Sequence, residues 1–600
     1  MSLSIALSNA LSGLQTSQSV IQVISNNVTN ANTEGYTRKI ADPVSRTILG
    51  VGQGVSASDI SRVVDERLLL TLRSTYSEAG RSKALSYYYN EIIAQFGSLS
   101  SNSSLGASLN DLTTTLQNLA AAPESSVHRL DAINDAVAVA KKLNEMSARI
   151  QTLRNDADKE ITDKVLVING ELQKIANLNS QVETARAKGE PTAELEDLRD
   201  QAINTVSKLV DVRYFARPSG AVVVTLADGR MLADTRANTL THPASAALSP
   251  DISYPNPGIA PILLNGTDIT TVVQGGELKG LIDARDTVLP NIQAEIDNLS
   301  LTLRDQINLL HNAGAGLPPA NTLTGTRTFA DPATDTITTS AGVRIAVVDA
   351  NGDFVAHYDL AAGTYTIDQI ETAIDTNLAT YASAATSAGG PLSISALASG
   401  NGIALVDLGT QNVLHTDGTT TFSGFSNYFG LNDFFVTPGK VQGGSTTALS
   451  ALLQVRSDIV GNPSLLSRGA LVADLTPVPV AGDKAVATGD GTIIQGIADK
   501  FLDTLSFGAS GDLSSTNATL SGYASEILAV NAVAASQAEK DLEFKDTLSQ
   551  ELSFRSQSIS GVNIDEEMQN LVIYENAYNA TARIVQVVAD LFDVLTNLGR

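Results

Sequence analysis

The chain has 600 residues and a hydrophobic content of 43%, which predicts several folded domains and excludes disorder throughout. Its formal net charge of −25 disfavours binding to nucleic acid or to anionic membranes. Cysteine is absent, which excludes disulfides and thiolate metal sites. No apolar run approaches the roughly 20 residues that span a bilayer, and no basic residue precedes Arg38. We therefore expect neither a membrane segment nor a cleaved secretory signal.

The N-terminal 33 residues contain no Asp, Glu, Lys or Arg. Within them a heptad pattern alternates spacings of four and three, which places its members on one seam of a helix. An amphipathic helix commonly packs on its own domain, but a solvated helix surface usually carries charges. The missing charges predict a helix that protein surrounds on both faces. The seam comprises Leu3, Leu7, Ala10, Leu14, Ser17, Ile21, Ile24 and Val28.

A second seam with the same alternation closes the chain. Two such seams at opposite ends of one chain predict that the terminal helices pair with each other as a coiled coil, or with copies of themselves. The C-terminal seam comprises Leu571, Tyr574, Tyr578, Thr581, Val585, Val588, Phe592 and Leu595.

A turn is expected directly after the first helix. Asn and Gly tolerate left-handed backbone, so a cluster of them predicts a helix stop followed by a turn. The next glycine-rich segment, 50–54, lacks the Lys-Ser/Thr ending of a phosphate-binding loop and is expected to be a flexible turn. The residues of the first turn are Asn26, Asn27, Asn30, Asn32, Gly35 and Tyr36.

Long helices are predicted over 62–98 and 131–188. At 1.5 Å per residue the second of these would reach roughly 85 Å, a length that compact globules seldom use. Gly189 and Pro191 should end it, and a helix over 192–209 would then run back along it as an antiparallel pair.

The pattern changes to alternation after residue 220. Val222, Val224 and Leu226 lead to Asp228-Gly229, which indicates a tight β-hairpin. A helix follows Pro290, and a Gly- and Pro-rich linker covers 314–319.

A stretch rich in Thr, Ala, Ser and Gly then covers 321–440. It contains the predicted strands 344–348 and 354–358, joined across Asn351-Gly352. Helices are expected again from about 493 and over 520–557.

The element order predicts a multidomain α+β protein built as a rod of nested domains. Residues 1–60 and 560–600 would form a terminal helical polymerisation domain. Residues 61–320 and 441–559 would form a long-helix domain with β-hairpins, and 321–440 an inserted β-rich outer domain.

Candidate chemistry is sparse, and we expect no enzyme activity, metal or cofactor. The five histidines are scattered without metal-ligand spacing and are predicted to be ordinary surface or turn residues. Asp349-Ala-Asn351-Gly-Asp353 superficially resembles a calcium loop, but Phe354 and Leu360 occupy positions where ligation needs glycine and glutamate. A hairpin turn is the better interpretation.

The segment Ser25-Asn-Asn-Val-Thr-Asn-Ala-Asn-Thr-Glu-Gly-Tyr-Thr-Arg38 resembles the signature that follows the first helix of bacterial flagellar rod, hook and hook-associated proteins. Glu34 departs from this signature, which usually has proline there. Four further segments are similar to those of a hook–filament junction member of this family. They are 198–212, 276–286, 429–435 and 560–567.

The resemblance implies a structural protein of the flagellum, placed at the hook tip between the hook and a second junction protein and needed for filament assembly and motility. It implies export through the flagellar type III apparatus and an extracellular location. The implied partners are further copies of the chain, the hook protein, the second junction protein and an export chaperone on the C-terminal helix. Two alternatives remain open: a hook or distal rod protein, or an axial protein whose 321–440 insert has adhesive or enzymatic activity.

Overall fold

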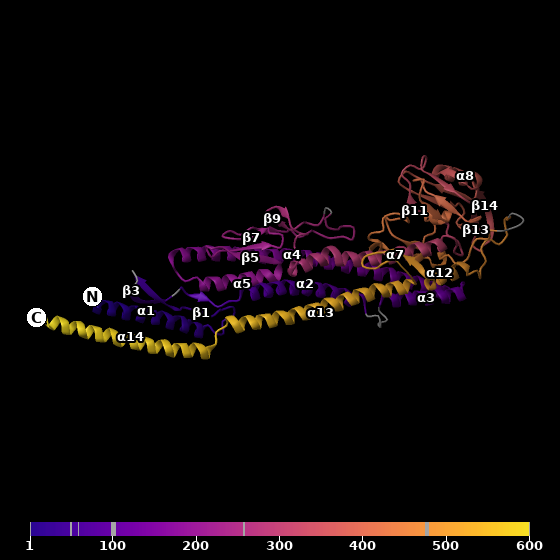
Figure 1. The fold of residues 1–600 in the computed structure, drawn as a ribbon. Coiled ribbons are helices and arrows are strands. Elements are labelled where there is room, and N and C mark those ends of the chain that lie inside the picture. Colours follow the sequence, from indigo (N-terminus) through magenta and orange to yellow (C-terminus); the bar gives the residue numbers. More distant parts are fainter. Residues whose placement is uncertain are drawn as a thin grey trace.

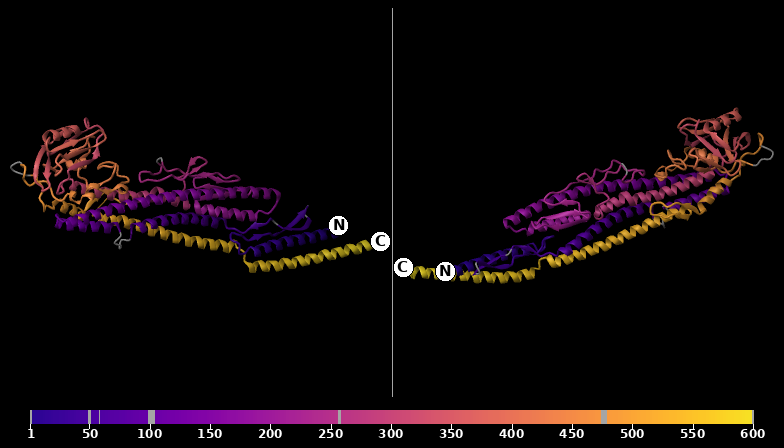
Figure 2. Two further views of the ribbon diagram at one scale, coloured as in Figure 1. Left: turned by 180° about the vertical axis from the view of Figure 1, so that it is seen from behind. Right: turned by 45° about the horizontal axis from the view of Figure 1, so that its top comes forward.

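The computed structural model describes residues 2–48, 51–57, 59–97, 104–255, 258–473 and 479–598. The molecule is elongated, with helices along most of its length (Figure 1 and Figure 2). Both termini lie at one end, and a compact unit of strands lies near the other. Helices and strands both make up large parts of the chain, which confirms the predicted α+β class.

The terminal helices α1 and α14 lie side by side, and a small β-structure packs against α1. β1 pairs with β4, and β2 pairs with β3, both antiparallel. β3 runs along α1, where the Thr16 hydroxyl donates to the Val55 carbonyl at 3.3 Å. The bounds are Ser2–Thr29 (α1), Lys39–Ile40 (β1), Pro43–Ile48 (β2), Val51–Ala57 (β3), Ser61–Arg62 (β4) and Ile564–Leu598 (α14).

The prediction of a flexible turn at 50–54 is wrong, because Gly52 and Gly54 lie within strand β3. Gly50 lies outside the described residues. Gly54 has a φ of +90°, and a Cβ at this position would lie 2.0 Å from the Ser12 Oγ of α1. The glycine is therefore explained by the close approach of β3 to α1.

Long helices build the middle of the molecule, and most of the predicted ones are present. α4 covers the predicted 131–188 and begins slightly earlier, at an N-cap formed by Ser125. It ends at Gly189 in the left-handed conformation, and α5 then runs back along it as predicted. The helices are α2 (Glu66–Phe96), α3 (Leu105–Ala121), α4 (Ser126–Lys188), α5 (Ala193–Leu209), α6 (Gly276–Asp283), α7 (Leu289–His311), α12 (Thr492–Leu502) and α13 (Leu520–Ser560).

Four features of this helical part differ from the prediction or were not predicted. α2 begins at Glu66 rather than at 62, because Asp65 caps it and Arg62 belongs to β4; Ser98 lies outside the described residues. The sequence did not indicate α3, nor the long packing of α13 along α2. α6 passes through a π-helical turn, Ala284–Val288, directly into α7.

One large hydrophobic core runs through these helices. It contains side chains of α2 to α7, α12 and α13, such as Ile150, Ile168 and Leu303, all fully buried. A core of this size can stabilise the long helices without contacts to other copies of the chain.

Small sheets pack against the long helices. The predicted hairpin at Asp228-Gly229 is confirmed, with Leu226 and Arg230 joined by a backbone hydrogen bond of 2.9 Å. The strands are β5 (Val212–Ala216), β6 (Val222–Leu226), β7 (Met231–Ala233), β8 (Leu240–Thr241), β9 (Leu263–Leu264), β10 (Thr267–Asp268), β21 (Phe435–Val436), β22 (Gln454–Val455), β23 (Leu505–Phe507) and β24 (Thr516–Ala518). Three short helical segments, α10 (Leu449–Leu452), α11 (Ser457–Gly461) and the 3-10 turn Pro463–Leu465, lie between β21 and α12.

The predicted β-rich stretch forms three antiparallel sheets, ordered β11-β17-β16, β15-β12-β19-β20 and β14-β13-β18. The predicted hairpin across Asn351-Gly352 is confirmed: Asp349 Oδ1 accepts from the Asn351 and Asp353 amides. Helix α8 was not predicted. The elements are β11 (Thr322–Thr328), β12 (Thr336–Thr339), β13 (Val343–Asp349), β14 (Phe354–Leu360), β15 (Gly363–Thr366), α8 (Ile367–Asn377), β16 (Ala382–Ala385), β17 (Pro391–Ala396), β18 (Asn401–Asp407), β19 (Asn412–Leu414), β20 (Thr421–Ser423) and α9 (Phe425–Phe429).

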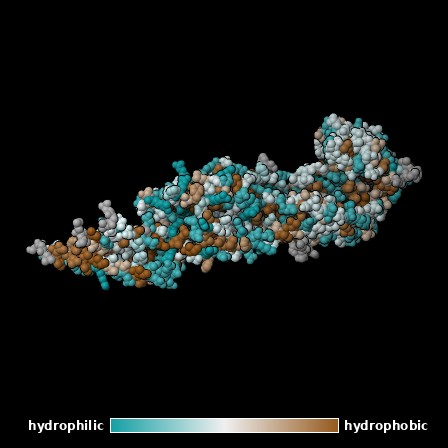
Figure 3. Space-filling model, viewed as in Figure 1, coloured by the Kyte–Doolittle hydropathy of each residue, from teal (hydrophilic) through white to brown (hydrophobic). Residues whose placement is uncertain are grey.

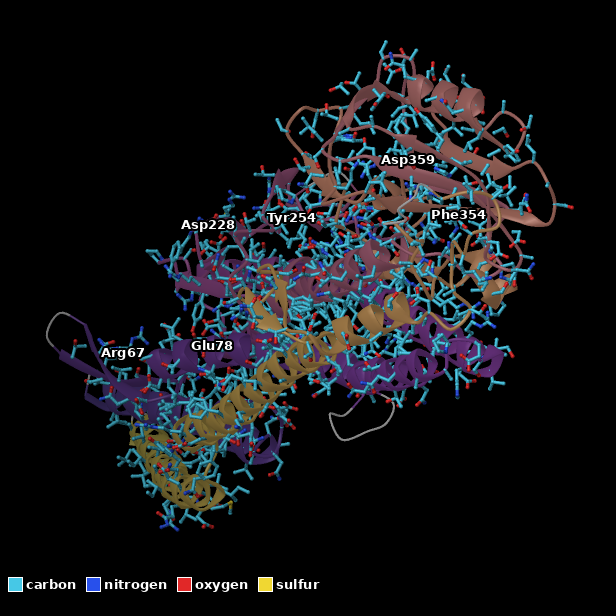
Figure 4. The ribbon with its side chains drawn as sticks, turned by 90° about the vertical axis from the view of Figure 1, so that its right-hand side faces the viewer. Arg67, Glu78, Asp228, Tyr254, Phe354 and Asp359 are labelled. Atoms are coloured by element: carbon cyan, nitrogen blue, oxygen red, sulfur yellow. The ribbon has the colours of Figure 1, made fainter. Side chains whose placement is uncertain are left out.

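This outer unit has its own core, which ends at Leu431, whereas Phe434 and Phe435 pack into the core of the long helices. Viewed along the molecule, Phe354 and Asp359 of the outer unit lie on one side of the long helices, and the terminal helices lie on the other (Figure 4). Asp228 and Tyr254 of the small hairpins lie on the same side as the outer unit. Within the described residues, no helix has the length and apolar character needed to cross a bilayer.

Gly80 of α2 tests how tightly the long helices pack. A Cβ at Gly80 would lie 2.3 Å from the Lys208 carbonyl oxygen and 2.9 Å from the Glu277 amide. Gly80→Ala should lower the free energy of unfolding by about 1–3 kcal/mol in urea titrations, although alanine is the better helix former. Gly170→Ala on α4 is the matched control, because nothing lies within 4 Å of its added Cβ. It should raise stability by up to about 1 kcal/mol, and equal effects of both variants would contradict the packing account.

Candidate assembly interface

The predicted N-terminal seam faces the elements that pack against α1, but these elements cover it incompletely. Ala10, Ser17 and Ile24 are buried, whereas Leu3, Leu7, Leu14, Ile21 and Val28 are only half-buried. Gly13 faces Thr581 of α14: a Cβ there would lie 3.1 Å from the threonine methyl.

The C-terminal seam is at least partly covered as far as Val588 and exposed beyond it. Val588 is buried, whereas Leu571, Tyr574, Tyr578 and Val585 are half-buried. Phe592 and Leu595 are exposed, at 38% and 63%. The end of the seam therefore has no partner within the described part of this chain.

A second stripe of α1 packs inward and was missed at the sequence level. Val20 and Val23 are buried with Ile24 and Ala41 in a cluster that Leu571 and Tyr574 border. Together with the buried Ala10 and Val588, this cluster is the hydrophobic core of the terminal pair among the described residues. It is very small for two helices of 28 and 35 residues.

The remaining faces of α14 expose further large apolar side chains. Figure 3 shows hydrophobic surface gathered at the end of the molecule where the termini lie. Such a contiguous apolar surface marks an interaction site on a soluble protein. The exposed side chains are Ile564, Met568, Val572, Ile573, Ile584, Val587, Leu591, Phe592, Val594 and Leu595.

Asn27, at the end of α1, holds the turn to α14. Its amide nitrogen donates to the Lys39 carbonyl at 2.9 Å and to Glu567 Oε2 at 3.0 Å. Its amide oxygen accepts from the Lys39 backbone N–H at 3.1 Å and the Tyr36 hydroxyl at 3.0 Å. A buried amide with four satisfied bonds fixes one geometry, because any displacement leaves a buried polar group unpaired.

Arg38 makes the second connection to α14. Its Nε donates to Glu567 Oε1 at 2.8 Å, and its Nη2 donates to Glu566 Oε1 at 2.8 Å. Its backbone amide donates to the Ser560 carbonyl at 2.7 Å, where α13 ends. The Glu567 side chain is 2% exposed, whereas that of Glu566 is 52% exposed.

The same turn is also bound to α5. Asp197 accepts from the Thr37 hydroxyl at 2.7 Å, from Lys39 Nζ at 2.7 Å and from Arg62 Nη1 at 2.9 Å. Lys39 Nζ also lies 3.2 Å from the centre of the Tyr36 ring. The turn residues 27–39 thus connect α1 with both α14 and α5. We call the polar side chains that make these connections the joint: Asn27, Tyr36, Thr37, Arg38, Lys39, Asp197 and Glu567.

Arg62 and Arg73 extend the joint toward α2. Asp200 on α5 accepts from Arg62 Nη1 at 2.8 Å and from Arg73 Nη2 at 3.0 Å. Burial acts to raise the pKa of Asp200, but the two guanidiniums outweigh it and hold the pKa below its ordinary value. The carboxylate therefore stays ionised and paired at neutral pH.

The predicted turn motif divides into two groups. Asn27 and Tyr36 lie in the joint, and Gly35 has a φ of +77° beside the Gln201 side chain. Asn26 and Asn32 are exposed, and Asn30 only completes the local turn by bonds to Asn26 and Thr33.

Sequence reasoning did not identify Lys39, Arg62, Asp197 or Asp200 as residues of this site. It also did not predict that Glu567 is a partner of Asn27. A signal was present, because the quoted segments 25–38, 198–212 and 560–567 all reach this one point. Nothing in their spacing shows that they meet.

His242 and His311 are buried, so the prediction of surface or turn positions is wrong for these two histidines. His242 Nε2 lies 3.0 Å from Asp158, which also accepts from Arg285 at 2.6 Å. Burial lowers the pKa of His311 to about 4, and the Ser467 amide donates to its Nε2. In the part of the chain that the structure describes, no group of three or more His, Cys, Asp or Glu side chains is placed to hold a metal ion.

Glu567→Gln should loosen the joint, because Asn27 and Arg38 donate to different oxygens of Glu567 and the substitution turns one of these acceptors into an NH2 donor. We expect a cost of about 1–3 kcal/mol, measured as roughly 5- to 150-fold faster tryptic cleavage after Arg38 under native conditions. Glu566→Gln is the matched control: its exposed ion pair should be worth at most about 1 kcal/mol. Equal cleavage rates in the two variants would show that the buried carboxylate does not hold the turn.

Comparisons with known proteins match the same regions. The family model described as "Flagellar hook-associated protein FlgK helical domain" matches residues 91–329. Models described as "Flagellar basal body rod FlgEFG protein C-terminal" and "Flagella basal body rod protein" match residues 556–598 and 7–37. The two rod-protein matches thus fall on the terminal helices.

Curated relatives match over the whole chain. The chain is 25% identical to flagellar hook-associated protein 1 of Escherichia coli and to that of Salmonella typhimurium, in each case over 99% of both chains. It is 24% identical to the Bacillus subtilis protein of that name, over 51% of this chain and 67% of the relative.

A solved structure, that of the flagellar hook junction protein FlgK from Burkholderia pseudomallei, shares 16% identity at a TM-score of 0.48. The match covers 82% of this chain and 100% of that chain. Full-length relatives of one name, and family models on the helical part and on both ends, thus agree in their similarity to this chain.

Proposed function

We propose that this protein is a structural junction subunit of the bacterial flagellum, which assembles at the hook tip and connects the hook to the filament. The names of its relatives support this role, as does the elongated shape with both termini at one end. Filament assembly and motility would depend on the subunit. Its chemistry is that of an assembling protein, and we propose no catalytic activity.

The observation that carries the proposal is the uncovered apolar surface of the terminal pair. α1 has no charged side chain, and α14 exposes apolar residues on faces that α1 does not reach. Burying one large apolar side chain stabilises by roughly 1.5–3 kcal/mol, and neighbouring copies in a tubular wall would supply that cover. The predicted seam residues of both helices then act as the assembly surface.

Folding of the terminal pair is coupled to this assembly. The pair has only a few buried apolar side chains, and isolated helices are marginal in water. In the monomer the helices would open readily, and they would become ordered when neighbours complete their core.

The domain organisation follows the path of the chain. Residues 1–60 and 560–600 form the polymerisation domain, with α1 and α14 as a coiled coil. Residues 61–320 and 441–559 form the long-helix domain, and 321–440 form the outer domain, each nested within the previous one. The separate cores of the outer unit and the long helices support this division, except that Phe434 and Phe435 pack with the long helices.

The partners follow from this placement. Copies of the chain would form a ring within a helical lattice, the hook protein would lie on one side and the second junction protein on the other. Before assembly, an export chaperone would cover the apolar face of residues 571–595. The protein would leave the cell through the flagellar type III apparatus without a cleaved signal and act outside the cell.

Deletion of the gene, followed by electron microscopy, tests the role. We expect hooks without filaments and filament protein shed into the medium, with filaments restored by the wild-type gene. Normal filaments in the deletion strain would contradict a junction role.

Complementation of the same strain with Leu14→Asp or Val585→Asp tests the assembly surface. Each aspartate would place a charge in the wall, and we expect no filaments although the long helices stay folded. Leu166→Asp is the matched control, because Leu166 is 64% exposed on α4, away from the seam. Filaments in both seam variants would contradict the proposal that the seam residues form the assembly surface.

A further inference from the structure

A cavity of about 340 Å³ lies at the root of the outer unit, away from the terminal helices. Its walls come from α7 of the long helices, from β11 and α9 of the outer unit, and from the loop 437–442 that follows β21. The volume falls in the range that small-molecule sites in proteins occupy.

Three arginines line this cavity from both units. Arg327 belongs to β11 of the outer unit, whereas Arg304 belongs to α7 and Arg456 follows β22 in the helical part. Arg304 Nε is paired with Asp305 Oδ1 at 2.7 Å, and Arg456 Nε with Asp458 Oδ2 at 3.0 Å.

Arg327 is the exception, because it has no acidic partner among the described residues. Its Nε and Nη2 donate to the main-chain carbonyls of Tyr428 and Gln442, both at 2.8 Å. Its guanidinium lies over the rings of Phe422 and Tyr428, at 4.5 and 4.6 Å from their centres. The residue is only 7% exposed, so an uncompensated positive charge is held in the wall of a cavity.

Asp433 also lines the cavity, but it forms no ion pair with Arg327. Its carboxylate accepts from the Thr326 hydroxyl and the Asn312 amide, both at 2.8 Å. Burial raises the pKa of Asp433, which disfavours its ionised form. The cavity thus has more positive than negative charge.

The unused donors point to the chemistry of an occupant. In the described part of the chain, Arg304, Arg327 and Arg456 each have one terminal nitrogen without a hydrogen-bond partner. Guanidinium groups recognise carboxylate and phosphate oxygens through paired donors.

We propose that this cavity binds a small polyvalent anion bearing carboxylate or phosphate groups. The anion bridges Arg327 of the outer unit to Arg304 and Arg456 of the helical part. It thereby cross-links the two units and stiffens the root of the outer unit.

Isothermal titration calorimetry on the full-length chain tests the site, with citrate and inorganic phosphate as probes at constant ionic strength. We expect saturable binding of at least one probe, weakened roughly tenfold or more in Arg327→Gln. Arg344→Gln is the matched control, because Arg344 is a similarly buried arginine of the same unit, paired with Asp359 outside the cavity. It should bind like the wild type.

If Arg327→Gln does not fold, Arg304→Lys replaces it, since lysine keeps the charge and loses the planar fork. Absence of saturable binding of both probes up to about 10 mM would overturn the proposal, as would equal binding by the wild type and the cavity variants. Sedimentation distinguishes a free anion from an acidic side chain of a second copy. Self-association that citrate competes away would assign the site to a neighbouring copy and overturn the free-anion assignment.

Discussion

The buried carboxylate of Glu567 is the contact on which the arrangement of this molecule depends. It accepts from Asn27 at the end of α1 and from Arg38 in the following turn, so both terminal helices are fixed to one point. The same turn reaches Asp197 of α5 through Thr37 and Lys39. Polar groups can set this geometry sharply, because a buried donor or acceptor that loses its partner costs about 1–3 kcal/mol.

The two ends of the joint differ in how they are stabilised. On one side, the long helices share a large continuous core and need no partner. On the other, the terminal helices share only a few buried apolar side chains and expose many more. The joint therefore orients a pair of helices that cannot stabilise itself. In the proposed junction, neighbouring copies would meet surfaces that already point in a defined direction.

Local patterns of the sequence, both periodic spacings and turn dipeptides, predicted much of this fold. The heptads identified both terminal helices, the spacing over 131–188 identified α4, and Asp228-Gly229 and Asn351-Gly352 identified two hairpins. These features are local, so a single stretch of chain carries the full signal. The α3 helix was not predicted, although Leu109, Leu112 and Leu116 have helical spacing; its packing on α4 and α12 is a tertiary feature.

The joint could be predicted only in part. Asn27 and Tyr36 stood out in a turn motif, but Glu567 lies 540 residues from Asn27, and no spacing rule pairs them. Asp197 and Asp200 were not singled out in the sequence, since burial of a charge depends on partners that come from distant parts of the chain. Gly54 was misread for the same reason: its close neighbour, Ser12, lies on another element.

Hydrogen exchange on the purified full-length monomer, compared with the assembled form, tests the central claim most directly. The account predicts that amides of residues 3–28 and 571–595 exchange at least about a hundredfold faster than those of the α4 core in the monomer, and become protected on assembly. Protection of residues 3–28 in the monomer equal to that of α4 would contradict it, because the terminal pair would then be stable without neighbours.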